Sequence, residues 1–148
     1  MDDFEKNWAR LGVKHDLVRG ESFYNDRMEP VVKELEEKKL LVESDGAMVV
    51  VLEDEGMPPC LVKKADGASL YATRDLATAV YRMEELKADV NLYVVGSDQA
   101  LHFKQVFSVL DKMGREWVKD CHHIGFGLVR FKNAGKISSR KGNIIRFS

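Results

Sequence analysis

The stretch from Lys136 to Gly142 reads Lys-Ile-Ser-Ser-Arg-Lys-Gly and places cations and hydroxyls close together in the chain. Lys and Arg side chains supply positive charge, and serine hydroxyls supply hydrogen bonds. Gly135 and Gly142 allow the backbone to turn and to approach a ligand closely. A loop of this composition suits a polyphosphate, although a solvated basic turn is the alternative interpretation.

A second group of polar residues lies upstream. Tyr71 and Asp75 are four residues apart and share one face if this segment is helical. A carboxylate beside a phenol hydroxyl suits a planar cation, because a guanidinium presents a fork of N–H donors to oxygen acceptors. The alternative is that Asp75 only complements the dipole at the start of its helix.

Gln99, His102 and Gln105 recur at intervals of three residues. On one helix, Gln99 and His102 would lie in the first turn, close to the end of the preceding strand. These side chains either hydrogen-bond a ligand or line the border of the core, and a single histidine is more often structural.

A metal site at His122 and His123 beside Cys121 is rejected, because adjacent strand residues point to opposite faces and the sequence has no second ligand pair. The letters His123-Ile124-Gly125 match part of a nucleotide-binding His-Ile-Gly-His signature. The fourth letter is Phe126, and the segment is predicted to be a strand, so this interpretation is also rejected.

Alternating strands and helices are predicted to position these residues. The predicted elements are strand 60–62, a helix from Thr73 to Leu86, strand 91–95, a helix from Ser97 or Asp98 to Gly114, and strand 123–129. This order predicts right-handed parallel crossovers and an α/β fold with a partial Rossmann-like parallel sheet of three strands. The apolar run 91–95 predicts a strand covered on both faces. Ligands of such sheets bind beyond the carboxyl ends of the strands, where the polar groups above are found.

The first part of the chain has a different pattern. Residues 2–11 and 28–41 are predicted helices, and Pro30 is expected in the first turn of the second one. Asp45-Gly46 between apolar runs predicts a β-hairpin. Pro58-Pro59 marks a connection. We therefore expect a small helical and hairpin insertion at residues 1–57, and the nucleotide-binding part at residues 58–148.

The composition sets further limits. The 148 residues are enough for a domain with a real core, and a formal net charge of −1 provides no global field that attracts nucleic acid. The cysteines Cys60 and Cys121 form neither a disulfide framework nor a zinc site, which favours a reducing, cytoplasmic setting. The sequence contains no signal peptide and no apolar run long enough to cross a membrane, so no membrane partner is expected.

Several blocks together resemble one family. The segment 66–77, Asp-Gly-Ala-Ser-Leu-Tyr-Ala-Thr-Arg-Asp-Leu-Ala, is similar to the signature of arginyl-tRNA synthetases, which are class I aminoacyl-tRNA synthetases. The segment 94–99 with Leu101-His102-Phe103 and Gln105 resembles the next block. The segments 123–127 and 136–143 resemble the last, which contains the arginyl form of the Lys-Met-Ser-Lys-Ser loop with Ile137 in place of Met. Upstream, residues 10–13, Asp16 and Gly20-Glu21-Ser22 resemble the same enzymes.

The resemblance implies ATP-dependent activation of arginine and transfer of the arginyl group to tRNA(Arg). ATP would be a substrate, with Mg, and no tightly bound protein cofactor is implied. The implied arginine pocket is Glu21, Tyr71, Asp75 and Gln99. The implied ATP contacts are His102, Gln105, Phe126, Gly127, Val129 and Lys136, and the residues implied to stabilise phosphate charge are Lys136, Ser138, Arg140 and Lys141.

Two parts of the family pattern are missing. The N-terminal half of the catalytic fold, with its His-Ile-Gly-His-type motif, and the C-terminal anticodon-binding domain have no counterpart in the sequence. We therefore expect an internal fragment that is inactive alone and whose sheet has an open edge where the N-terminal half docks. The alternatives are a stand-alone module that binds a nucleotide, arginine or a protein partner, and a globular domain with no ligand.

Overall fold

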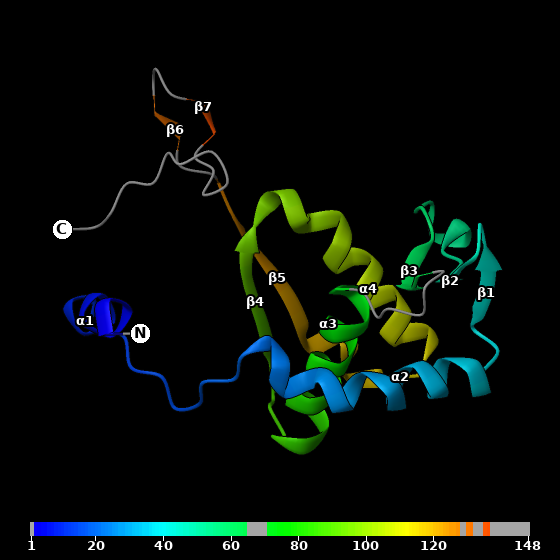
Figure 1. Cartoon of the computed structure of the whole chain (residues 1–148), viewed down its shortest axis with the longest axis horizontal. Helices are drawn as coiled ribbons and strands as arrows, with labels where there is room; N and C mark the ends of the chain where they lie inside the picture. Colours follow the sequence, from blue (N-terminus) through cyan, green and yellow to red (C-terminus); the bar gives the residue numbers. More distant parts are fainter. Residues whose placement is uncertain (1, 65–70, 128–129, 132–134, 137–148) are drawn as a thin grey trace.

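A computed structural model describes residues 2–64, 71–127, 130–131 and 135–136, with the side chains of residues 4–64 and 71–127. Helices α2, α3 and α4 lie between a parallel pair of strands, β4 and β5, and an antiparallel sheet formed by β1, β2 and β3 (Figure 1). Helix α1 (Asp2–Arg10) stands apart from this body, at the end of an extended segment. The described part of the chain therefore has the mixed α/β character that the sequence predicts.

The antiparallel sheet contains the predicted hairpin. Strands β1 (Leu41–Ser44) and β2 (Ala47–Val50) are joined by Asp45 and Gly46, whose φ angles of 50° and 76° are those of a two-residue hairpin turn. Strand β3 (Cys60–Lys63) pairs antiparallel with β2, so its predicted place in the parallel sheet is wrong. The short apolar run of β3 does not specify which strand it pairs with. Residues 51–59 reverse the chain direction, so β3 pairs with β2.

Helix α2 (Asn25–Glu37) begins three residues before the predicted start at Met28. Pro30 consequently lies inside the helix and not in its first turn. The predicted end at Leu41 is also wrong, because Lys39 adopts a left-handed φ of 57° and Leu41 begins strand β1. The helix is stopped by this local reversal of the backbone, which the apolar spacing of the sequence does not reveal.

Helix α3 (Tyr71–Val80) is continued by a π-helical turn, Tyr81–Glu85, so the helical segment reaches almost to the predicted end. Thr73, the predicted first residue of this helix, lies inside it and is fully buried. Its hydroxyl donates to the carbonyl of Val62 at 2.5 Å. Thr73 therefore attaches α3 to strand β3.

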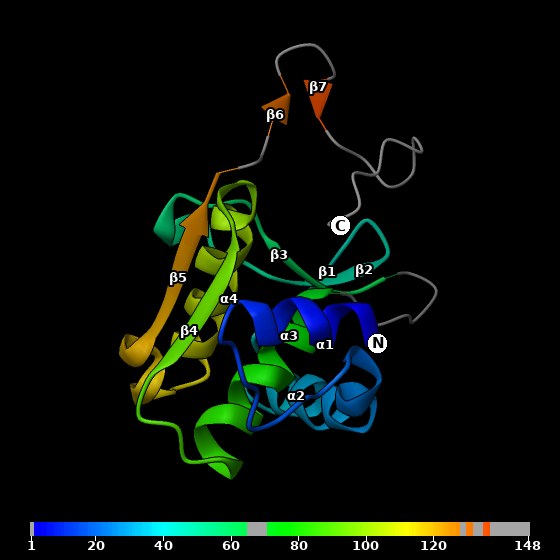
Figure 2. The ribbon, with the colours of Figure 1, turned by 90° about the vertical axis from the view of Figure 1, so that its left-hand side faces the viewer.

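Strands β4 (Asn91–Gly96) and β5 (Cys121–Phe126) are parallel and in register from Asn91–Cys121 to Gly96–Phe126 (Figure 2). Helix α4 (Ala100–Lys112) forms the crossover between them, preceded by the 3₁₀ turn Ser97–Gln99. The α-helix thus begins at Ala100, with Gln99 at its N-cap, and not at Ser97 or Asp98 as predicted. The Ser97 hydroxyl instead donates to the carbonyl of Phe126 at 3.1 Å and connects the ends of the two strands.

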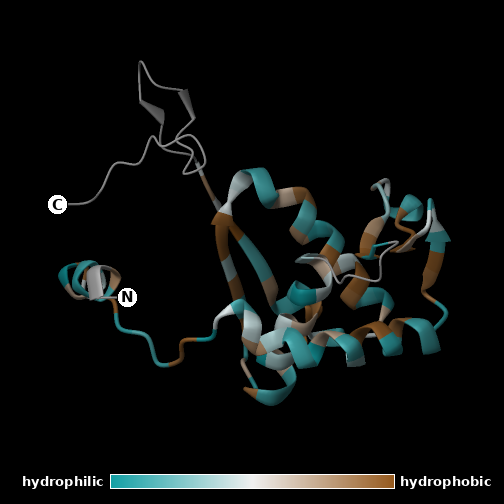
Figure 3. Cartoon of the chain, viewed as in Figure 1, coloured by the Kyte–Doolittle hydropathy of each residue, from teal (hydrophilic) through white to brown (hydrophobic). Residues whose placement is uncertain are grey.

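The parallel strands are covered on one face only within the described chain. Burial alternates along β4, and Leu92 and Val94 are 54% and 66% exposed, although the strand is largely hydrophobic (Figure 3). The prediction of a strand covered on both faces is therefore wrong for these residues. A continuous apolar run indicates that a second layer suits the strand, but it does not say which segment supplies that layer.

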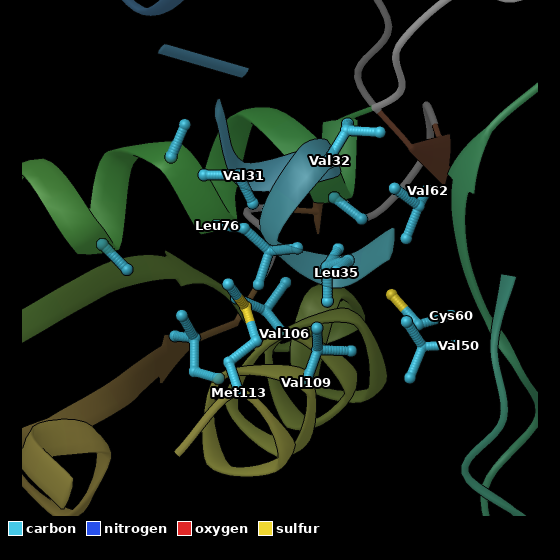
Figure 4. Packing of buried hydrophobic residues seen from close by; sticks show 14 of the residues in the cluster. Val31, Val32, Leu35, Val50, Cys60, Val62, Leu76, Val106, Val109 and Met113 are labelled. Carbon is cyan, nitrogen blue, oxygen red and sulfur yellow. The ribbon is translucent and has the colours of Figure 1, made fainter. Parts of the chain in front are cut away.

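The main core lies where α2, α3 and α4 meet the antiparallel sheet (Figure 4). Leu35, Leu76 and Val106 are fully buried in it, together with Val62 from β3. The core thus takes residues from both sides of the expected boundary at 57/58. A smaller cluster of Met83, Tyr93, Phe103 and Cys121 packs between α4 and the parallel strands.

Candidate functional site

A cleft of about 460 Å³ opens between α3, the first turn of α4 and the segment that leads into α2. Its walls carry carboxylates, guanidinium groups, hydroxyls and aromatic rings. The lining residues are Arg19, Glu21, Tyr24, Tyr71, Arg74, Asp75, Thr78, Arg82, Val95, Gln99, His102 and Phe103. The cleft contains both polar acceptors and cations, so it suits a small molecule that carries charges of both signs.

Helix α3 contributes one continuous face to this cleft. Tyr71, Asp75 and Thr78 follow one another at intervals of four and three residues, so they project from the same side of α3. Arg82, in the π-helical turn that continues the helix, also lines the cleft. Tyr71 is 72% exposed and lies at the rim. The predicted pairing of Tyr71 and Asp75 on one helical face is confirmed.

Asp75 contacts His102 across the cleft. The Nε2 atom of His102 lies 2.6 Å from Oδ2 of Asp75, and the two side chains are 24% and 32% exposed. Since a carboxylate accepts hydrogen bonds, Nε2 is the donor. This contact joins α3 to α4 and holds one carboxylate oxygen at the wall of the cleft.

Glu21 is the second carboxylate of the cleft. The guanidinium of Arg74 donates from Nη1 to Oε2 of Glu21 at 3.0 Å, and the Glu21 side chain is 74% exposed. Arg74 is more enclosed, with 24% exposure. The ion pair connects the turn at residues 21–24 to α3 and shows that Glu21 already accepts from a guanidinium in this structure.

Two more cations line the same space. The guanidinium of Arg19 lies 4.8 Å from the centre of the Phe23 ring. Arg82 lies 5.3 Å from the centre of the Tyr93 ring and donates to Oδ1 of Asn91 at 3.3 Å. Burial raises the pKa of the Tyr93 hydroxyl well above its usual range, so it stays protonated. These aromatic contacts hold Arg19 and Arg82 where they can meet an anionic group.

The carboxyl ends of β4 and β5 form a tight edge beside the cleft. A Cβ atom on Gly125 would lie 2.8 Å from Oγ of Ser97, and one on Gly96 would lie 2.7 Å from Oδ1 of Asp98. Only glycine fits this close approach without displacing a neighbour. The edge is the position at which open parallel sheets bind ligands.

The cleft brings together five of the predicted site residues: Glu21, Tyr71, Asp75, Gln99 and His102. Gln105 does not line it. Its Nε2 atom donates to the carbonyl of Pro58 at 2.8 Å, so its predicted orientation toward ATP is not supported by the geometry. Gln105 is one turn of α4 beyond His102 and faces the 58–59 connection instead.

The remaining predicted residues lie elsewhere. Phe126 and Gly127 are exposed at the end of β5 and do not line the cleft. Lys136 belongs to β7 (Gly135–Lys136), which pairs with β6 (Arg130–Phe131), and only its backbone is described. Val129, Ser138, Arg140 and Lys141 lie outside the described residues.

Sequence reasoning missed Arg19, Arg74 and Arg82. Arg82 follows Asp75 by seven residues, so the helical repeat that paired Tyr71 with Asp75 also predicts its position. Arg74 stands beside Asp75 but meets Glu21 only through tertiary structure. No pattern in the sequence indicates a role for Arg19, because residues 19–24 are far from α3 in the chain and approach it only in the folded structure.

Within the described residues, no group of three or more His, Cys, Asp or Glu side chains is arranged to hold a metal ion. No helix of the same part of the chain combines the length and apolar character needed to span a membrane.

A family model described as "tRNA synthetases class I (R), catalytic domain" matches residues 1–148. The arginine–tRNA ligase of Clostridium beijerinckii is 58% identical over 145 residues, which are 98% of this chain and 26% of the relative. That of Clostridium botulinum strain Alaska E43 is 57% identical over the same length. The chain thus spans about a quarter of the length of the curated relatives it matches.

Solved structures agree with this match. The crystal structure of arginyl-tRNA synthetase from Plasmodium falciparum superposes with a TM-score of 0.75 at 30% identity, covering 86% of this chain and 22% of that one. Arginyl-tRNA synthetase from Thermus thermophilus superposes with a TM-score of 0.61 at 17% identity, covering 78% and 27%, and shows likeness of fold.

Proposed function

Because this chain belongs to the arginine family of class I tRNA synthetase catalytic domains, we propose that it supplies part of the site that activates arginine with ATP. The arginine carboxylate attacks the α-phosphorus of ATP, a P–O bond forms, and pyrophosphate leaves. A hydroxyl at the 3′ end of tRNA(Arg) then attacks the carbonyl of arginyl-adenylate, and AMP leaves. No protein nucleophile takes part, so the enzyme works by positioning and by stabilising charge.

The observation that carries the proposal is the convergence of Glu21, Tyr71, Asp75 and Gln99 on one cleft from separate parts of the chain. Asp75 and Glu21 supply carboxylates, while Tyr71 and Gln99 supply neutral acceptors. A guanidinium is planar and fixed in shape, and it can donate to several of these at once. The ammonium of lysine cannot form that fork, so arginine is preferred.

Arginine also carries a carboxylate that has to reach ATP. Arg19 and Arg82 line the same cleft, and each is positioned by an aromatic ring. We assign them to the anionic part of the bound ligands. A cleft with acceptors on one wall and guanidinium groups on another orients a molecule that is positive at one end and negative at the other.

ATP is assigned to the edge beyond β4 and β5. In this proposal Phe126, Gly127 and Val129 border the nucleotide, with Mg on its phosphates. Lys136, Ser138, Arg140 and Lys141 stabilise the negative charge that develops on the phosphates as pyrophosphate leaves. The position of this edge, at the carboxyl ends of two parallel strands, supports the assignment.

We further propose that residues 1–57 are a connective insertion and that residues 58–148 are the second half of a cytoplasmic enzyme's catalytic domain. The shared core implies that the two parts fold together. The rest of the enzyme, with the first half of the catalytic domain and an anticodon-binding domain, would complete the site. The 148-residue chain alone is then expected to form no arginyl-adenylate.

A composite enzyme tests the proposal. This chain replaces the 145 matched residues of the Clostridium beijerinckii arginine–tRNA ligase, and arginine-dependent exchange of pyrophosphate into ATP is measured. We expect exchange with arginine, much less with lysine, and none from the 148-residue chain alone. A folded composite without exchange would contradict the proposed activity, and exchange by the isolated chain would contradict the need for the missing half.

A further inference from the structure

His102 and Asp75 form a contact between two helices at the wall of the cleft. Nε2 of His102 and Oδ2 of Asp75 are 2.6 Å apart. The His102 side chain is 24% exposed and the Asp75 side chain is 32% exposed, so both are mostly buried. Both residues line the cleft. Among residues 4–64 and 71–127, His102 is the ion-pair partner recorded for Asp75.

Aromatic packing fixes the imidazole ring. The ring of His102 meets the edge of Phe103 at 5.2 Å with an interplanar angle of 76°. Phe103 is 4% exposed, lies 4.8 Å from Tyr93, and stacks on His123 at 4.9 Å. His102 therefore adjoins a buried cluster that is anchored to both parallel strands, and it is not a freely moving side chain.

The chemistry of the donor distinguishes this contact from the Glu21–Arg74 pair. The imidazole of His102 donates a single hydrogen bond from Nε2 to one oxygen of Asp75, which orients the carboxylate. Arg74 brings a full positive charge to Glu21 at 3.0 Å. Asp75 therefore keeps Oδ1 free of the His102 contact, whereas Glu21 is paired with a guanidinium in this structure.

We propose that His102 is a positioning residue for arginine: it holds the Asp75 carboxylate in place for the substrate guanidinium. This inference rests on the proposed function. The hydrogen bond occupies one lone pair of Oδ2 and fixes the plane of the carboxylate, which leaves Oδ1 and the second lone pair of Oδ2 for the guanidinium fork. This role differs from the ATP contact that the family resemblance implies for His102.

Kinetics of the composite enzyme test the proposal. His102→Phe keeps a flat ring but removes the donor, whereas His102→Gln keeps an N–H donor. We expect His102→Phe to raise the KM for arginine by about 10- to 100-fold with the KM for ATP within about twofold, because misplacing a binding group by about 1 Å costs up to 100-fold. His102→Gln should recover part of the loss. Lys104→Gln, at an exposed position of the same helix, is the matched control.

The outcomes separate this proposal from the proposed function. If the composite enzyme with native His102 shows no arginine-dependent exchange, the proposed function fails. If that enzyme is active and His102→Phe leaves the arginine KM within about twofold, or raises the KM for ATP equally, the positioning role is overturned.

A second test uses the native 148-residue chain and needs no variant, so it does not depend on how well a variant folds. Nitrogen NMR shifts at pH 8 report which imidazole nitrogen of His102 carries the proton. We expect the Nε2–H form in the native chain, since Nε2 faces the Asp75 oxygen. An Nδ1–H form would overturn the proposal, because Nε2 could then donate nothing to Asp75.

Discussion

Arg74 donates from its guanidinium to the carboxylate of Glu21 at 3.0 Å, although the two residues are 53 positions apart in the sequence. The pair attaches the turn before α2 to α3 and closes one wall of the cleft. It also shows, inside the protein, the type of contact that the cleft is proposed to make with its substrate. Its strength decides how easily Glu21 exchanges one guanidinium for another.

We predict that this pair is weak. Glu21 is 74% exposed, so solvent screens the attraction, and a double-mutant cycle of Glu21→Gln and Arg74→Gln should give a coupling of only about 0.2–1 kcal/mol in the free energy of unfolding. Urea denaturation of the native chain, both single variants and the double variant measures it. A coupling above about 2 kcal/mol would mean that Glu21 is not readily available to a substrate.

The buried hydroxyl of Thr73 should matter more for stability. Thr73→Val keeps the shape but leaves the Val62 carbonyl without its donor, which should cost about 1–3 kcal/mol of unfolding free energy. Thr78→Val is the control, because Thr78 donates at 2.8 Å to the Arg74 carbonyl, which also belongs to the hydrogen-bond ladder of α3. Equal losses in the two variants would contradict the role of Thr73 in attaching α3 to β3.

The shared core predicts one cooperative unfolding transition. Leu35→Ala should cost about 2–5 kcal/mol, because Leu35 is fully buried against residues from both sides of position 57. Leu11→Ala, at a side chain that is 75% exposed, should change stability by less than about 0.5 kcal/mol. Circular dichroism and tryptophan fluorescence should give coincident transitions. Separate transitions would mean that residues 1–57 and 58–148 fold independently.

Stability should fall at alkaline pH. Burial raises the pKa of the Cys60 thiol to about 11 from an ordinary value of 9.0, so the folded state holds the proton more tightly than the unfolded state. The stabilisation is complete below about pH 9 and is lost as the pH rises toward 11. At pH 10 the loss should be about 1 kcal/mol.

Cys60→Ala isolates this effect. Burial also raises the pKa of Tyr93 and of Cys121, and both groups change stability in the same direction. The unfolding free energy of the variant should therefore still decline with pH, but less steeply than that of the native chain. Parallel pH profiles for the two proteins would contradict the assigned role of the Cys60 thiol.

The parts of the structure that local chemistry determines could be predicted from the sequence. Asp45-Gly46 specifies a hairpin turn because both residues tolerate positive φ, and the spacing of Tyr71 and Asp75 follows from the helical repeat. The edge of the parallel strands at which a ligand is expected follows from the chain order of strands and helices. These local rules were enough to predict that Asp75, Gln99 and His102 lie close together.

Tertiary pairing could not be predicted in the same way. The run 60–62 is apolar enough for either sheet, and only the folded chain shows that β3 joins β2. Gln105 looks like a ligand residue from its spacing, yet it hydrogen-bonds the 58–59 connection. The contact between Glu21 and Arg74 depends on how residues 19–24 cross α3. Such choices depend on the packing of the whole core, not on any short window of sequence.

The central claim is that the Asp75 carboxylate recognises the guanidinium of arginine. Asp75→Asn in the composite enzyme removes the charge and keeps the shape, and Asp111→Asn, at an exposed position outside the cleft, is the control. A hydrogen bond to a charged group contributes about 1.5–3 kcal/mol, so we predict a rise of about 10- to 150-fold in the KM for arginine. The KM for ATP should stay within about threefold. Equal losses for arginine and ATP, or an unchanged KM for arginine, would contradict the account.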